Sequence, residues 1–197
     1  MIKKKVKVKK KVKKCKNPKL ENKAQEILND IDFKFLSEGN DGELYKFKIN
    51  KNRSFNQTVL KPGEYIIKIF RYPVKNITRL KLLSDKGLIP KIYLITSKYI
   101  IMKYIKAVTL YEFIKENKDK DLYDPEHIIK RLRFLINQWH KLGFAHGDLI
   151  LTNILITDDY KIYLIDPKIK SENYHIDDDY ADLEHLESYL KNQDEYD

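Results

Sequence analysis

The stretch from Trp139 to Lys168, WHKLGFAHGDLILTNILITDDYKIYLIDPK, contains the most informative pattern in the sequence. Three polar side chains stand in it among mostly apolar neighbours: Asp148, Asn153 and Asp166. Asp or Asn at a single position of this kind often does no more than cap a turn. Three of them at this spacing, with Asn153 five residues after Asp148, instead indicate one shared polar site.

Two short apolar runs, at 154–156 and 162–165, flank a turn at 157–160 and predict a β-hairpin. A hairpin brings the start of its first strand beside the end of its second. We therefore expect Asn153 and Asp166 to be neighbours. Their oxygen atoms suit Mg²⁺, which binds through a few such ligands together with substrate phosphates.

The pattern H-G-D-x-x-x-x-N followed by I-D, which begins at His146, resembles the catalytic and metal-binding loops of the protein-kinase-like superfamily. Gly147 in place of arginine is similar to the atypical branch, which includes the RIO kinases, the small KEOPS-complex kinase, aminoglycoside phosphotransferases and lipopolysaccharide-core kinases. The resemblance implies that Asp148 is the catalytic aspartate and that Asn153 and Asp166 hold Mg²⁺. His146 is expected to brace the loop by hydrogen bonds.

Residues 33–49, FKFLSEGNDGELYKFKI, alternate on both sides of a glycine-containing turn, which predicts a second hairpin. The turn resembles the glycine-rich loop that covers ATP phosphates in kinases, where glycine lets the backbone approach phosphate. Gly39 and Gly42 match two of its glycines and Leu44 matches its valine, so the resemblance assigns all three to nucleotide binding. Taken alone, the stretch also fits an ordinary hairpin turn.

Lys68 stands between apolar residues in the predicted strand EYIIKIFR, residues 64–71. A lysine buried in a strand needs a partner, whereas a lysine on an exposed face does not. The resemblance favours the first reading and implies that Lys68 contacts the α- and β-phosphates of ATP.

The amphipathic helix predicted at 75–87 lacks the glutamate that usually pairs with this lysine. Three alternatives are open. Asp85 replaces the glutamate, Asn76 or Thr78 occupies its position, or Lys68 pairs with nucleotide and Asp166.

The segment IMKYIKAVTLYEFI, residues 101–114, resembles the connector between the lobes of these kinases. The resemblance places the adenine base against one set of residues: Met102, Lys103, Tyr104, Ile105 and Leu155. Further helices are predicted at 109–118, where Thr109 and Glu112 match a capping box, and at 127–142.

Only 31 residues follow Asp166, so the second lobe is expected to be small. Ile150 stands where these kinases usually carry a lysine, and we hypothesise that Lys168 folds back to replace it. Residues 177–179, three aspartates, predict a charged loop or a substrate-facing acidic patch. A last helix is expected at 181–191, with Asp182 resembling the aspartate that holds the catalytic loop.

The formal charge of +10 belongs to one end of the chain. Residues 1–19 contain eleven lysines and no acids, and the remaining residues hold 28 Lys and Arg against 29 Asp and Glu. The charge of this basic tail predicts contact with anionic lipid, RNA or an acidic protein. The alternative is a solvated tail without a specific partner. The single cysteine, Cys15, and the absence of a signal sequence favour an intracellular, cytoplasmic location, with a peripheral membrane contact through the tail as a further reading.

The sequence thus predicts an α+β, two-lobed protein-kinase-like fold: a basic tail at 1–19, an antiparallel β N-lobe at 20–104 and a reduced helical C-lobe at 105–197. The implied function is transfer of the ATP γ-phosphate to a hydroxyl with Mg²⁺, first as an atypical serine/threonine protein kinase. The alternatives are a small-molecule or glycan kinase and a pseudokinase that serves as a binding module. A nucleic-acid-binding protein with a basic arm is a more distant reading, because the basic charge lies off the folded part.

Overall fold

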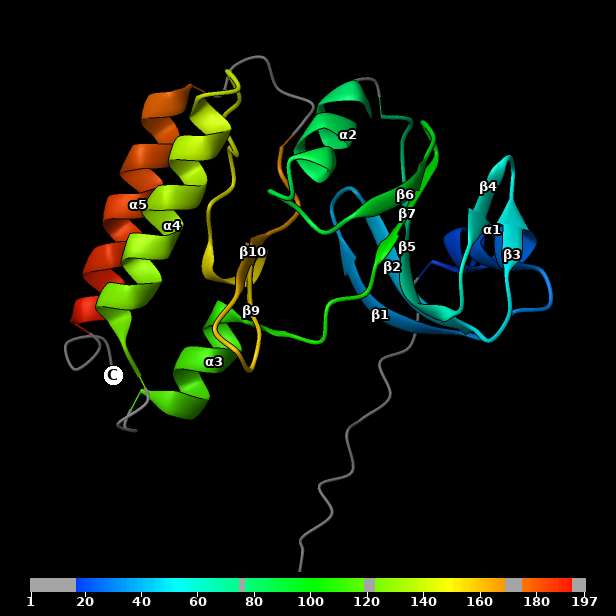
Figure 1. Cartoon of the computed structure of the whole chain (residues 1–197), viewed down its shortest axis with the longest axis horizontal. Helices are drawn as coiled ribbons and strands as arrows, with labels where there is room; N and C mark the ends of the chain where they lie inside the picture. Colours follow the sequence, from blue (N-terminus) through cyan, green and yellow to red (C-terminus); the bar gives the residue numbers. More distant parts are fainter. Residues whose placement is uncertain (1–16, 75–76, 119–122, 169–174, 193–197) are drawn as a thin grey trace, which may run out of the picture.

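The computed structural model describes residues 17–74, 77–118, 123–168 and 175–192. Most of the predicted basic tail, and Asn76 as a candidate partner of Lys68, lie outside these residues. Within them, one lobe is built on an antiparallel sheet and the other mainly on helices (Figure 1). This is the α+β, two-lobed arrangement that the sequence predicted.

The sheet of the first lobe has the strand order β1-β2-β5-β7-β6, and every neighbouring pair is antiparallel. Its strands are β1 (Phe33–Gly39), β2 (Gly42–Ile49), β5 (Gly63–Phe70), β6 (Ile92–Ile95) and β7 (Tyr99–Lys103). Successive side chains of a strand point to opposite faces. In β2, Tyr45 and Phe47 are therefore buried on one face, while Leu44 lies on the other, opposite Lys68 of β5.

Helix α1 (Pro18–Leu28) supports the face that carries Tyr45 and Phe47. Asn17 caps its first turn by accepting from the backbone of Lys19, and an apolar stripe of Leu20, Ala24 and Leu28 is buried against the sheet. The polar segment after β2 contains a short hairpin that the sequence did not predict, formed by β3 (Arg53–Phe55) and β4 (Thr58–Leu60). Phe55 and Leu60 extend the same apolar cluster.

Helix α2 (Ile77–Asp85) connects the two lobes by packing with both. Ile77 packs against Phe70 and Ile100, which lie on the Lys68 face of the sheet, whereas Leu80 and Leu83 belong to the core of the second lobe. The helix ends as predicted before Gly87, whose φ of 71° suits a residue without a Cβ.

The second lobe begins after the linker at 104–107 and combines helices with a small three-stranded sheet of order β10-β9-β8. Its elements are β8 (Val108–Thr109), α3 (Leu110–Asn117), α4 (Pro125–His140), a 3-10 turn (Leu151–Asn153), β9 (Ile154–Ile156), β10 (Ile162–Leu164) and α5 (Ile176–Lys191). Helices α4 and α5 lie side by side (Figure 1). The predicted capping box at Thr109 and Glu112 is present at the start of α3.

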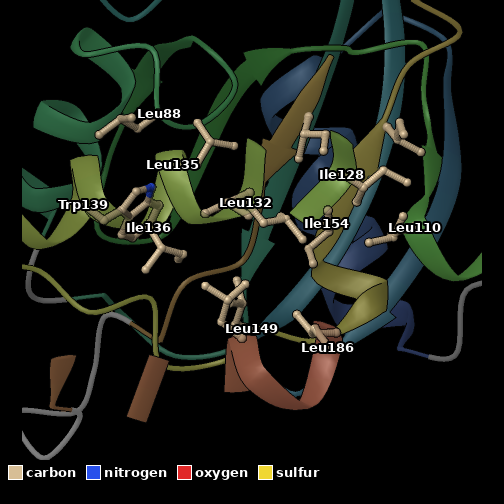
Figure 2. Close-up of a cluster of buried hydrophobic side chains, with 14 of the residues drawn as sticks. Leu88, Leu110, Ile128, Leu132, Leu135, Ile136, Trp139, Leu149, Ile154 and Leu186 are labelled. Carbon is tan, nitrogen blue, oxygen red and sulfur yellow. The ribbon is translucent and has the colours of Figure 1, made fainter. Parts of the chain in front are cut away.

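The core of this lobe lies directly beneath the polar stretch around Asp148. Figure 2 shows Leu132 and Ile136 of α4 on the side of Leu149 and Leu186, in the same cluster as Leu135. Leu149, the residue after Asp148, is 1% exposed and anchors that stretch in the core. Within the described ranges, no helix combines the length and apolarity needed to cross a bilayer.

Candidate functional site

The Asp148 loop, defined here as residues 146–153, connects helix α4 to strand β9. Gly147 in this loop has a φ of 72°, a left-handed conformation that favours glycine over the usual arginine. The side-chain nitrogen Nδ2 of Asn153 donates to the backbone oxygen of Asp148 at 3.0 Å and to its carboxylate Oδ2 at 2.9 Å. The side chains of Asp148 and Asn153 therefore meet, as their spacing predicted.

Asp166 joins them through the hairpin of β9 and β10. The backbone nitrogen of Ile165 donates to the carbonyl of Asn153 at 2.9 Å, which brings the end of the second strand to the start of the first. Asp166 itself has a φ of 58°, a conformation that Asp tolerates better than most residues. The predicted hairpin geometry is confirmed.

Lys68 reaches this group of residues from the other lobe. The Lys68 side chain is only 9% exposed, and its ammonium Nζ donates to the Asp166 carboxylate in an ion pair. A buried ammonium needs such a partner because water no longer solvates it. The Lys68–Asp166 pair joins residues 98 positions apart in sequence.

Among the alternative partners proposed for Lys68, the Asp166 pairing is the one the structure contains. Asp85 is bound elsewhere: Lys91 Nζ lies 2.7 Å from its Oδ1, and this hydrogen bond lowers the pKa of the Asp85 carboxyl. Thr78 is exposed on α2.

The glycine turn between β1 and β2 lies over Asp166. Gly39 and Gly42 pair with each other across a two-residue loop. A Cβ on Gly39 would lie 4.0 Å from the Oδ2 atom of Asp166, whereas a Cβ on Gly42 would lie 2.0 Å from the backbone oxygen of Ile69. Gly42 is thus required by the close approach of β5. Gly39 leaves space beside the Asp166 carboxylate.

Lys168 folds back onto Asp148, as we hypothesised. Its ammonium Nζ lies 3.1 Å from Asp148 Oδ1, and its backbone nitrogen donates to the carbonyl of His146 at 2.9 Å. Ile150, at the position that usually carries this lysine, points outward and is 47% exposed. The positive charge is therefore supplied by the segment after Asp166.

His146 braces the loop from within. It is completely buried and stacks at a tilt on Trp139, with ring centroids 5.0 Å apart. Its Nε2 lies 3.1 Å from the carbonyl oxygen of Ile165, which can only accept, so Nε2–H donates. Burial lowers the pKa of the His146 imidazole, which keeps the ring neutral.

Asp179 holds the backbone of the Asp148 loop, and this corrects two predictions. The residues 177–179 are not a loop, because α5 already begins at Ile176. Asp179 is completely buried and accepts from the backbone nitrogens of His146 at 2.7 Å and Gly147 at 2.8 Å, and from His140 Nε2 at 2.9 Å. The loop-holding role was expected at Asp182.

Asp182 makes a lesser contact of the same kind. One of its carboxylate oxygens accepts from the backbone nitrogen of Leu149 at 3.3 Å. Partial burial raises the pKa of the Asp182 carboxyl, and the Leu149 hydrogen bond opposes that shift. One signal in the sequence could have identified Asp179: it extends the apolar stripe of Leu183, Leu186 and Leu190 by one helical turn, where a buried side chain is expected.

The residues predicted for adenine lie along β7, the linker and β9. Met102 is half-buried against the cluster of Phe70 and Ile100, and Lys103 is exposed at the end of β7. Tyr104 and Ile105 are half-buried in the linker, and Leu155 pairs with Thr109 just beyond it. These positions agree with a hinge between the lobes, but their role in binding a base stays a prediction.

Two further contacts fix the start of the linker and were not foreseen. The ammonium of Lys46 lies 3.5 Å from the ring centroid of Tyr104 and 2.7 Å from Glu64 Oε1. The backbone nitrogen of Tyr104 also donates to the carbonyl of Glu64 at 3.2 Å. These contacts tie the linker to strands β2 and β5.

The donor set fits a cation that retains phosphate or water ligands. In the described part of the chain, no group of three or more His, Cys, Asp or Glu side chains gathers around one point. Asp166 and Asn153 supply one carboxylate and one amide oxygen, and Mg²⁺ commonly binds through one or two such groups plus substrate phosphates. A metal held by protein side chains alone does not fit this set.

Comparison with known proteins agrees with this geometry. The RIO domain family matches residues 43–176. A probable bifunctional tRNA threonylcarbamoyladenosine biosynthesis protein of Thermoplasma acidophilum is 35% identical over 63 residues, which are 32% of this chain and 12% of that protein. The serine/threonine-protein kinase cds1 of Schizosaccharomyces pombe is 32% identical over 68 residues, 34% of this chain and 15% of that protein.

A viral relative is matched over a longer segment. Serine/threonine-protein kinase 1 of Heliothis zea nuclear polyhedrosis virus is 28% identical over 90 residues, 44% of this chain and 34% of that protein. The matches thus cover only 12% to 34% of the lengths of these three relatives. The family match, by contrast, covers more than half of this chain and includes Lys68, the Asp148 loop and Asp166. The chain therefore belongs to the RIO domain family, whose members are atypical kinases of the protein-kinase-like superfamily.

Proposed function

We propose that the chain is an ATP- and Mg²⁺-dependent phosphotransferase that acts on a hydroxyl of a protein. The observation that carries this proposal is the meeting of Asp148, Asn153 and Asp166 with Lys68 from the other lobe. Packing of the core does not by itself explain why Lys68 is buried and paired across the lobes, or why the Asp148 carboxylate is left partly open to solvent. Phosphoryl transfer needs both.

Each residue has a defined task in the reaction. Asp148 orients the acceptor hydroxyl and takes its proton as the oxygen attacks the γ-phosphorus. The new oxygen–phosphorus bond forms while the bond from the γ-phosphorus to the β,γ-bridging oxygen breaks, and ADP leaves with the electron pair. Asn153 and Asp166 would hold Mg²⁺, which when bound neutralises charge on the phosphates.

Two lysines would offset the negative charge of the ATP phosphates during transfer. In this proposal Lys68 contacts the α- and β-phosphates when nucleotide enters between the lobes. Lys168, 3.1 Å from Asp148, is placed to offset charge on the transferred group in the role that a lysine two residues after the aspartate usually has. The Gly39–Gly42 turn would cover the phosphates from above.

The test is transfer of radiolabelled γ-phosphate from ATP with Mg²⁺ to a panel of basic, acidic and neutral protein acceptors. We expect Asp148→Asn to lower the rate of transfer by about 100-fold or more, since general-base catalysis is worth 10²–10⁴-fold. Asp177→Asn, an exposed aspartate on α5, is the matched control and should transfer at the wild-type rate. Equal rates for wild type and Asp148→Asn, or no transfer to any acceptor, would contradict the proposal.

A further inference from the structure

A groove runs beside the Asp148 loop, between it and helix α5, and the proposed chemistry does not use it. Its volume is about 520 Å³. Its apolar lining includes Ile150, Leu151, Leu186 and Tyr189, and its polar lining includes Asp182 and His185. Leu149 and Ile150, which line the groove, follow directly after the predicted catalytic residue Asp148 in the chain.

Ile150 forms an exposed apolar edge of the groove close to Asp148 in sequence. The side chain is 47% exposed although isoleucine gains free energy by leaving water. It stands two residues after Asp148, the residue to which an acceptor would present its hydroxyl. An apolar group of that molecule placed on Ile150 and Tyr189 would remove both from water.

The charge around the groove favours a cationic molecule. Residues 105–197 contain 12 Lys and Arg against 20 Asp and Glu, whereas residues 17–104 contain 17 Lys and Arg against 9 Asp and Glu. The two parts of the chain therefore carry opposite net charges, which cancel when residues 17–197 are counted together. On α5, Asp178 lies one turn before Asp182 on the helix face that lines the groove. An acidic surface attracts a basic segment and repels a polyanion.

The dimensions favour an extended polypeptide. From Asp182 to Tyr189, the part of α5 that lines the groove, the helix rises seven residues, or about 10 Å, which matches about three residues of extended chain. We propose that this groove docks the acceptor polypeptide and selects segments with Lys or Arg close to the hydroxyl and an apolar side chain beside it. The inference rests on the proposed function, because it names the substrate class of the same site.

The experiment measures binding of a fluorescent decapeptide by anisotropy, with the full chain and without ATP. The peptide carries one serine with lysines before it and valines after it, and a second peptide has glutamates in place of the lysines. We expect Asp182→Asn and Ile150→Ser each to raise the Kd for the basic peptide about fivefold, through loss of an ion pair and of apolar burial respectively. The acidic peptide should bind at least tenfold more weakly to the wild type.

Matched control variants are available for both substitutions. Glu184→Gln removes a charge from α5 outside the groove lining, and Phe134→Ser removes an apolar side chain of similar exposure, 50%, from α4. Both should leave the Kd within twofold of the wild type. All variants keep residues 1–16, so any competition from that lysine- and valine-rich segment acts on them equally.

The outcomes separate the docking site from the proposed function. Wild-type chain that binds neither peptide, or groove variants that bind like the controls, would overturn the docking site even if phosphate transfer is observed. Binding that follows the predicted order supports the docking site even if no transfer occurs, in which case the phosphotransferase proposal alone fails.

Discussion

At the scale of single residues, the Asp148 carboxylate is held by Asn153 and Lys168, neither of which is adjacent to it in sequence. Asn153 fixes one carboxylate oxygen and Lys168 approaches the other. The lysine comes from the segment after Asp166, twenty residues beyond Asp148 in sequence, as the hypothesis that Lys168 folds back expected. A carboxylate held between a donor and a cation is oriented before any substrate arrives.

Replacing Lys168 tests whether this cation serves the reaction. We expect Lys168→Ala to lower kcat by about 10- to 100-fold, because a preorganised charge facing the transferred group is lost. The KM for ATP should stay nearly unchanged, since Lys68 still binds the phosphates. Lys161→Ala, whose ammonium pairs with the exposed Asp159, is the control. Wild-type turnover by Lys168→Ala would show that the contact has no catalytic role.

The neutral His146 makes stability depend on pH. Burial lowers the pKa of the folded imidazole below its unfolded value, so the unfolded chain binds the proton more readily. This contribution to stability is present above about pH 6.5, the unfolded value, and is lost as the pH falls below it.

Urea titrations at pH 7.5 and pH 5 measure this effect. The free energy of unfolding should fall less steeply with acidification in His146→Gln than in the wild type, by up to about 1.4 kcal/mol per pH unit. His185→Gln, at an exposed position of α5, should keep the wild-type slope. Equal slopes for wild type and His146→Gln would rule out the buried neutral ring as the cause.

At the scale of elements, helix α5 holds the Asp148 loop in place through one buried carboxylate. Asp179 accepts from two loop nitrogens and from His140 of α4. Asp179→Asn replaces one acceptor oxygen by an amide that cannot accept from these donors. We expect a loss of about 2–4 kcal/mol in the free energy of unfolding. Asp177→Asn, exposed in the same helical turn, should cost less than 0.5 kcal/mol, roughly the range for surface substitutions.

Denaturation with urea and phosphate transfer should be measured on the same two variants. Unchanged stability and activity in Asp179→Asn would mean that the loop is held by its apolar anchors, Leu149 above all.

The two glycines of the turn between β1 and β2 are expected to differ: Gly42 is needed for stability and Gly39 for nucleotide binding. Gly42→Ala should destabilise the sheet by about 2 kcal/mol, because its Cβ would overlap the Ile69 carbonyl and force β2 and β5 apart. Gly39→Ala meets no atom closer than 4.0 Å, so stability should be kept while ATP binds more weakly. Thermal unfolding and nucleotide titration distinguish the two. Equal loss of stability in both variants would contradict this division.

Elements with a strong local pattern were predictable, whereas very short strands and residues whose role depends on tertiary contacts were not. The Asp148 hairpin, helix α3 with its capping box, and the Lys68 strand follow from periodicity and capping residues. Strands β3 and β4 were missed because three residues are too few to show an alternation. Asp179 was misread because three consecutive acids resemble a loop, and only burial against α4 and the Asp148 loop reveals its role.

At the scale of the whole molecule, three contacts join the lobes around the candidate site. The Lys68–Asp166 pair crosses between them, α2 packs into both cores, and the Gly39 turn lies over Asp166. Sequence could name Lys68 and Asp166 through the family pattern. It could not choose their mutual pairing over a helix partner, because the choice depends on where α2 places Asp85.

Binding of ATP through Mg²⁺ at this junction can be measured by isothermal titration of ATP in the presence of Mg²⁺ and in the presence of EDTA. We expect wild type and Asp148→Asn to bind ATP with a Kd that rises at least tenfold when Mg²⁺ is removed, whereas Asp166→Asn should bind weakly and show little dependence on Mg²⁺. Asp166→Asn that binds ATP as tightly as the wild type, with the same dependence on Mg²⁺, would contradict this expectation.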